Sequence, residues 1–114
     1  MTDDVRATAR RMYAAFNAHD HAAANEIFTA DFYSHPLDVT GPEAVTRSWQ
    51  RFHEAYPDAW VVVEEMIVEG DRAAVRTSVH GIPGQRPPTM LEIFRVRDGR
   101  IAELWGLSAL RRDA

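Results

Sequence analysis

The hairpin near the C-terminal end of the chain constrains the fold most. Residues 89–106, TMLEIFRVRDGRIAELWG, are two alternating apolar runs on either side of an Asp-Gly pair, which is a strong hairpin signal. Because successive strand residues point to opposite faces, Glu92 shares a face with Met90 and Phe94. A carboxyl group there is either solvated at the open end of a sheet or placed in a pocket where it moves protons.

Two turns fit this hairpin, and they give different registers. A two-residue turn sets Glu92 against Trp105, whereas a three-residue loop with glycine in a bulge pairs Val96 with Arg100 and sets Glu92 against Leu104. We favour the three-residue loop, because it places small residues on the face of Glu92 and leaves room above the sheet. These small residues are Ala102, Gly106 and Ser108.

In the favoured register, the other face of the hairpin is a flat apolar surface on which Arg95 lies diagonal to Glu103. An exposed surface of this kind is an aggregation liability in a monomer. We therefore predict a homodimer that forms through the outer face of the sheet. The apolar residues of this face are Leu91, Ile93, Ile101, Trp105 and Leu107.

The rest of the chain predicts three helices and two further strands. Apolar residues recur at helical spacing over 3–18 and 42–56, and a shorter helix is expected over 21–28. Residues 59–81 are two β-rich runs joined by a Glu-Gly-Asp hairpin signal. Three helices followed by four antiparallel strands predict an α+β domain with the helices on one face of the sheet.

Composition predicts one domain over residues 1–114, with 46% apolar and 26% charged residues. The absence of cysteine excludes disulfides and thiolate sites, and five histidines without paired spacing predict no metal site. A net charge of −4 with scattered basic residues argues against a nucleic-acid partner. The charged start shows no secretory signal and no apolar run is long enough to span a membrane, so the expected location is cytoplasmic.

Six segments resemble, in the same order, the SnoaL-like polyketide cyclases of the nuclear transport factor 2-like superfamily. They are MYAAFNAHD, GPEAV, VEGDRAAVR, VHG, PPT and IFRVRDGRIAELW. The resemblance implies a cone of three N-terminal helices packed on a strongly curved antiparallel sheet, with a ligand cavity inside and a dimer formed through the sheet. The same fold hosts cofactor-free enzymes and inert binding modules, so the fold does not determine the reaction.

Glu92 is the central catalytic candidate, because it matches a position where these cyclases carry a histidine. The cyclases place an acid–base aspartate where this chain has Gly106. Enclosure by Met90, Phe94 and Leu104 would raise the pKa of Glu92 towards neutrality. A carboxyl group tuned in this way can take up and return a proton near pH 7.

His80 and His35 are the candidate partners of Glu92, although each is equally well read as an exposed or structural histidine. His80 would relay protons if it faced inward, and His35 lies where the family presents a polar group, with Ser34 as the other possibility. Further candidates for substrate contact are residues expected to wall the cavity or its mouth. They are Tyr13, Phe16, Trp49, Phe52, Trp60, Met90, Phe94, Leu104 and Gly106.

Three functions follow from this pattern. The first is a cofactor-free, cyclase-like or isomerase-like enzyme that acts by acid–base chemistry on a hydrophobic, carbonyl-bearing molecule such as a polyketide. The second is a module that binds a ligand without changing it, which the glycine at position 106 favours. The third is a dimerisation domain with a vestigial cavity. We adopt the first as the working hypothesis because of Glu92.

Overall fold

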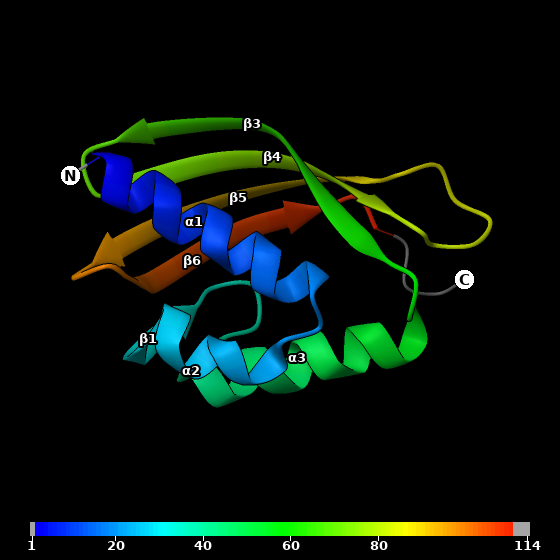
Figure 1. Ribbon diagram of the computed structural model, residues 1–114, viewed down its shortest axis with the longest axis horizontal. Helices are drawn as coiled ribbons and strands as arrows, with labels where there is room; N and C mark the ends of the chain where they lie inside the picture. The colour runs from blue at the N-terminus through cyan, green and yellow to red at the C-terminus, as the bar shows by residue number, and fades with distance from the viewer. Residues whose placement is uncertain (1, 111–114) are drawn as a thin grey trace.

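The computed structural model describes residues 2–110, and these form three α-helices, one short 3₁₀ helix and six strands. Figure 1 shows the helices on one side of a strongly bent sheet. Within residues 2–110, no helix is long and apolar enough to cross a membrane. The elements are α1 (Thr2–Asn17), η1 (His21–Ala23), α2 (Ala24–Ile27), β1 (Phe28–Ser34), β2 (Val39–Thr40), α3 (Pro42–Ala55), β3 (Trp60–Glu69), β4 (Arg72–His80), β5 (Thr89–Arg97) and β6 (Arg100–Ser108).

The sheet is larger than the four antiparallel strands predicted. Its strand order is β2-β1-β6-β5-β4-β3, and β1 pairs with β6 in parallel while the other neighbours are antiparallel. A bulge in β3 between Val63 and Glu65 accompanies the bend of that strand in Figure 1. The sheet curls without closing, so the predicted α+β cone is confirmed.

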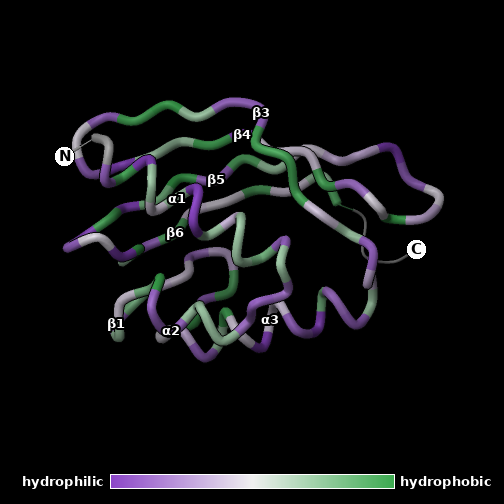
Figure 2. Tube along the Cα trace, in the orientation of Figure 1, coloured by the Kyte–Doolittle hydropathy of each residue, from purple (hydrophilic) through white to green (hydrophobic). Residues whose placement is uncertain are grey.

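The helices form because their apolar positions recur once per turn and are covered by the sheet. On α1, Val5, Ala9 and Met12 are buried, and on α3 Val45 is buried. Figure 2 shows polar and apolar positions alternating along α1 and α3. Proline at the first position of α3 supplies the helical φ angle without losing a needed donor. The largest fully buried apolar side chains are Phe28, Phe32, Phe94, Ile27, Ile101 and Val79.

The β5–β6 turn has two residues, so the favoured three-residue loop is wrong. Asp98 and Gly99 both have positive φ angles, 53° and 75°, as a type I′ turn requires. Val96 consequently pairs with Ile101 rather than with Arg100. This turn twists in the same sense as the flanking strands, which makes it a favoured connection for a hairpin.

A bulge beside this turn then changes the register by one residue. Beyond it, Glu92 pairs with Gly106, and neither of the two expected partners lies opposite. The predicted face of Glu92 is nevertheless correct, because the observed register has the same strand parity as the favoured one. Ile101 is the exception: it was expected outside but is 0% exposed, since it lies on the turn side of the bulge, where the parity is reversed.

Asn17 ties the end of α1 to the start of β3, which is an edge strand. Its amide nitrogen donates to the carbonyl oxygen of Val61 at 2.8 Å, and its amide oxygen accepts from the Val61 nitrogen at 2.7 Å. The side chain therefore satisfies two main-chain groups that the edge of a sheet leaves unpaired. This contact fixes α1 over the concave face of the sheet, where the candidate site lies.

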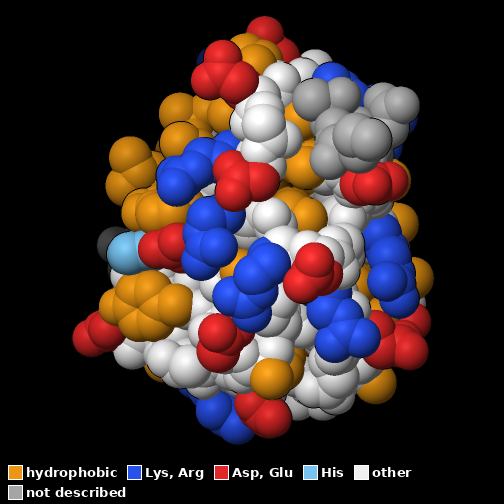
Figure 3. All heavy atoms as spheres, turned by 90° about the vertical axis from the view of Figure 1, so that its left-hand side faces the viewer, with side chains coloured by type: hydrophobic (Ala, Val, Ile, Leu, Met, Phe, Trp, Pro, Cys, Tyr) orange, Lys and Arg blue, Asp and Glu red, His pale blue; other side chains and the backbone are white. Residues whose placement is uncertain are grey.

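Figure 3 looks onto the end of the molecule that carries the β3–β4 and β5–β6 turns. Acidic and basic side chains are interspersed over this end. A surface that binds a nucleic-acid backbone is usually clustered and basic, and this end has no such character.

Candidate active site

A cavity of about 550 Å³ lies between α1, α3 and the concave face of the sheet. Its volume is that of an ordinary small-molecule site, and its wall is mainly aromatic and aliphatic. Among the described residues, Glu92 is the one carboxyl group in that wall. The other lining side chains that carry a polar group are Tyr13, Ser34, Ser48, Trp49 and Ser108.

Glu92 is held by a tyrosine from the first helix. The Tyr13 hydroxyl donates a hydrogen bond of 2.7 Å to Glu92 Oε1. Tyr13 is itself buried, and its ring packs edge-on against Phe94 at a centroid distance of 6.0 Å. One turn beyond Tyr13, the two hydrogen bonds between Asn17 and Val61 hold this end of α1 against the sheet.

Burial governs the protonation of this pair. Removal from water raises the pKa of Glu92 above its ordinary value of 4.5, and the hydrogen bond from Tyr13 partly opposes the rise. Burial also raises the pKa of Tyr13, and the neighbouring Glu92 charge and hydrogen bond add to the effect. Tyr13 therefore remains the protonated donor of the pair, and the pKa of Glu92 lies above its ordinary value because of burial.

The second carboxyl oxygen of Glu92 faces the strand partner, Gly106. Glu92 Oε2 has no hydrogen bond to any described residue. A Cβ atom built on Gly106 would lie 3.3 Å from Glu92 Cγ and 3.8 Å from Oε2. A side chain at 106 would therefore compete for space with Glu92.

Most of the predicted wall residues line the cavity. Ser34, which is 1% exposed, lines it, whereas His35 does not. Phe94 does not reach the cavity because it is fully buried behind Tyr13. The predicted residues that line it are Tyr13, Phe16, Ser34, Trp49, Phe52, Met90, Glu92, Leu104 and Gly106.

Trp60 and His80 lie on the other side of the sheet. The inward positions of β4 are its odd-numbered residues, which are buried, so His80 points outward. The His80 ring stacks on Trp60, which is 47% exposed, at 5.1 Å. His80 Nε2 lies 2.9 Å from Ser78 Oγ. The predictions that His80 works with Glu92 and that Trp60 lines the mouth are therefore corrected.

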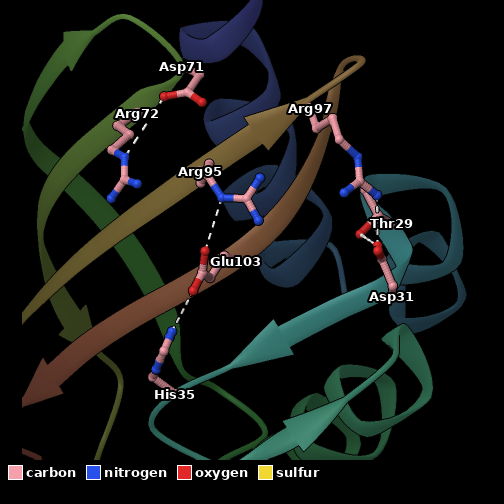
Figure 4. Close-up of polar contacts among 8 residues, drawn as sticks. All are labelled: Thr29, Asp31, His35, Asp71, Arg72, Arg95, Arg97 and Glu103. Atoms are coloured by element: carbon pink, nitrogen blue, oxygen red, sulfur yellow. Dashed lines mark hydrogen bonds and ion pairs between the residues drawn. The ribbon is translucent and has the colours of Figure 1, made fainter.

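His35 also belongs to the outer face. Its ring stacks on Trp105 at 4.7 Å, and its Nε2 lies 2.7 Å from Glu103 Oε2. Figure 4 shows His35 and Arg95 on either side of Glu103, and none of these three residues lines the cavity. The prediction that His35 acts in the pocket is corrected in the same way, and the side chain that contacts Glu92 is Tyr13.

Sequence reasoning placed Tyr13 in the wall but missed its hydrogen bond to the carboxyl group. The two residues are 79 positions apart, and no local pattern joins a helix to a strand over that separation. Other lining residues were not named as such from the sequence, and one of them, Leu107, was expected on the outer face alone. They are Met12, Phe28, Phe32, Pro36, Leu37, Val45, Ser48, Val61, Val79, Leu107, Ser108 and Leu110.

The chain was compared with known families and solved structures. The family model described as SnoaL-like domain matches residues 9–104. IdmH from Streptomyces antibioticus, provisionally assigned as a polyketide cyclase, is 29% identical, with a TM-score of 0.78 over 92% of this chain and 91% of that chain. A loop-truncation variant of IdmH is 30% identical, with a TM-score of 0.80 over 92% of each chain.

A provisionally assigned ketosteroid isomerase from Kribbella flavida shares the fold at 20% identity, with a TM-score of 0.80 over 97% of this chain and 82% of that one. No curated protein sequence matches the chain. The family match spans both the helix that carries Tyr13 and the strand that carries Glu92. The chain therefore belongs to the SnoaL-like domain family.

Proposed function

We propose that this protein is a cofactor-free acid–base enzyme that acts on a hydrophobic, carbonyl-bearing small molecule, in a cyclase-like or isomerase-like reaction on a polyketide-like substrate. The observation that carries the proposal is the Glu92–Tyr13 pair in the wall of a largely apolar cavity. A desolvated carboxyl with one free oxygen is suited to accept a proton from carbon. The likeness to IdmH supports the substrate class.

In this proposal, ionised Glu92 removes a proton from the carbon next to a carbonyl group, through Oε2. The C–H electron pair forms a carbon–carbon double bond and the carbonyl oxygen becomes an enolate. A serine hydroxyl of the cavity, such as Ser34 or Ser48, donates to that oxygen. Glu92 then returns the proton to another carbon in an isomerisation, or to the new alkoxide after the enolate has attacked a second carbonyl.

The test of this assignment is the titration of Glu92, followed through the NMR signal of its carboxyl carbon. We expect a midpoint above the ordinary 4.5, because burial disfavours the charged form. The Glu92→Gln variant identifies the signal, and Tyr13→Phe should move the midpoint further up, since it removes a donor that stabilises the carboxylate. A midpoint at or below 4.5 would remove the basis of the proposal.

A ligand-binding module without turnover is the second candidate. It is favoured by the scarcity of titratable groups, since Glu92 and Tyr13 are the ones found in the described wall of the cavity. An enzyme with a single exchangeable proton must use the same carboxyl to take and to return it. Loss of a proton-transfer activity on substitution of Glu92 separates this candidate from the enzyme.

We also propose that the protein is a homodimer through the outer sheet face, defined by Leu91, Ile93, Trp105 and Leu107. Leu91 and Leu107 are 53% and 79% exposed, and Arg72 lies over the Trp105 ring at 5.1 Å. On the same face, Glu103 contacts both Arg95 and His35, and these three side chains form a small polar network (Figure 4). An apolar surface with a small polar network is typical of a subunit interface.

Trp105→Glu is expected to dissociate this dimer, because it places a charge in an apolar contact. Sedimentation analysis of 12.9 kDa chains distinguishes the two states directly. Trp105→Phe is the matched control, since it keeps an aromatic ring and should stay dimeric. A parent protein that sediments as a monomer, or a Trp105→Glu variant that remains a dimer, contradicts the interface.

A further inference from the structure

A second hollow, of about 470 Å³, lies beside α3 and meets the main cavity. The two share Leu37, Ser48, Phe52 and Leu110 in their walls, so the hollows adjoin. The walls of the two hollows differ in charge. Two arginines, Arg47 and Arg51, line the outer hollow, whereas the main cavity contains the carboxyl group of Glu92.

Arg47 and Arg51 are one helical turn apart on α3, so their side chains leave the same face of the helix. Neither guanidinium group has a hydrogen bond or ion pair with the described residues, and no aspartate or glutamate among them lines this hollow. Arg76, Arg95 and Arg97, by contrast, each pair with a carboxylate on the sheet. Within the part of the chain that the structure describes, the outer hollow therefore holds two positive charges that no carboxylate neutralises.

Guanidinium groups bind carboxylate and phosphate through paired N–H donors, which gives them both affinity and orientation. The main cavity is a poor place for an anion, because its wall is apolar and it contains Glu92, whose charge would repel one. An amphipathic ligand would therefore bind in one direction, with its apolar body inside and its anionic end outside.

We propose that the ligand of this protein is an amphipathic anion, whose carboxylate or phosphate-ester group is bound by Arg47 and Arg51 while its apolar, carbonyl-bearing part occupies the main cavity. The inference rests on the proposed function of that cavity and narrows its substrate class. In this arrangement the arginines orient the substrate and keep its charge away from Glu92. They take no part in proton transfer.

Two fluorescent probes with the same ring system test the charge preference. 1-Anilinonaphthalene-8-sulfonate is an amphipathic anion, and N-phenyl-1-naphthylamine is its neutral counterpart without the sulfonate. In Arg47→Gln/Arg51→Gln, we expect the Kd of the anionic probe to rise about tenfold, or about 1.4 kcal/mol, and the Kd of the neutral probe to stay unchanged. The difference in Kd for the anionic probe between the parent and this variant should be smaller at high salt.

Arg6→Gln/Arg10→Gln is the matched control. These two arginines are also four residues apart on one helix, α1, and line neither hollow, so the variant removes the same charge at another place. It should leave the Kd of both probes unchanged. If the Kd of the anionic probe rose as much in this control, its binding would depend only on the net charge of the protein, and that result would overturn the inference.

Competition then identifies the anion. Decanoate, decyl phosphate and decanol are compared as competitors of the bound neutral probe at one ionic strength. The anion that displaces the probe at the lower concentration carries the group that the arginines prefer. If decanol displaces the probe as effectively as either anion does, the inference is overturned. Failure of the neutral probe to bind would instead contradict the proposed apolar site, so the two proposals fail by different results.

Discussion

Glu92→Gln is expected to slow proton abstraction in the cavity by about 10²- to 10⁴-fold, the usual contribution of a positioned general base. A suitable probe is 5-nitrobenzisoxazole, because its reaction needs one base and no knowledge of the natural substrate. The base takes the proton from the ring carbon, the electron pair forms a nitrile, and the N–O bond breaks to release a coloured phenolate. The proton passes from Glu92 to water.

The glutamine variant keeps the shape of the side chain and an oxygen that can accept the Tyr13 hydrogen bond. Its fold should therefore persist, and its stability gives an independent check. Because the pKa of Glu92 is raised, the folded state binds more protons than the unfolded state just above pH 4.5, so this group makes stability fall as pH rises. Glu92→Gln should thus be at least as stable as the parent at neutral pH, as thermal unfolding can establish.

Two further variants make the result specific. Glu54→Gln removes an exposed carboxyl of α3 that does not line the cavity, and it should leave the rate unchanged. Tyr13→Phe should keep the reaction but move its pH–rate curve upward, because the ionised base loses a hydrogen bond. A Glu92→Gln rate equal to that of the parent would favour the binding module over the enzyme.

The face of Glu92 could be predicted because strand alternation fixes it, and the register could not because a bulge interrupts the alternation. Ile101 and Ala102 are consecutive apolar residues, and both are buried. A regular strand cannot bury two successive side chains on one face, whereas a bulge can. This pair is therefore the sequence signal for the bulge, and it was read as an ordinary part of the strand.

The partners of Glu92 could not be predicted because they depend on how distant segments pack. The choice between Ser34 and His35 rests on the parallel pairing of β1 with β6, which no local pattern reveals. The Tyr13 contact depends on the docking of α1 over β5. By contrast, the wall residues Trp49 and Phe52 followed from helical periodicity alone, because a helix with one apolar face must turn it towards the sheet.

A histidine cluster at the junction of α1, η1 and α3 predicts a second large effect, on stability in acid. His53 is 5% exposed, its ring stacks on His19 at 3.7 Å, and its Nδ1 lies 2.8 Å from His21 Nε2. The other ring nitrogen of His53 is buried without a partner among the described residues. Burial, and then the charges of His19 and His21, lower the pKa of His53 from 6.5 to about 4.

Between about pH 4 and 6.5 the folded state therefore binds fewer protons at His53 than the unfolded state does. We therefore expect the free energy of unfolding to fall as pH drops through this window, by about 1–2 kcal/mol between pH 7 and 5. This value is smaller than the whole pKa shift of His53 would give, because His19 is exposed to water, which screens its charge. His53→Gln removes the titration. Urea unfolding at fixed protein concentration should show less loss of stability in acid for this variant than for the parent, and the opposing contribution of Glu92 cancels in that difference.

His80→Gln is the control, since His80 lies on the opposite face of the sheet from this cluster and its replacement should leave the acid dependence as it is in the parent. The cause of the effect is the enclosure of one imidazole among two others, where no described carboxylate is bonded to it. A bonded carboxylate would stabilise the charged ring and reverse the sign. An identical acid dependence in the parent and in His53→Gln would therefore mean that the His53 ring is protonated in the folded state without penalty, and that the packing against His19 and His21 does not oppose it.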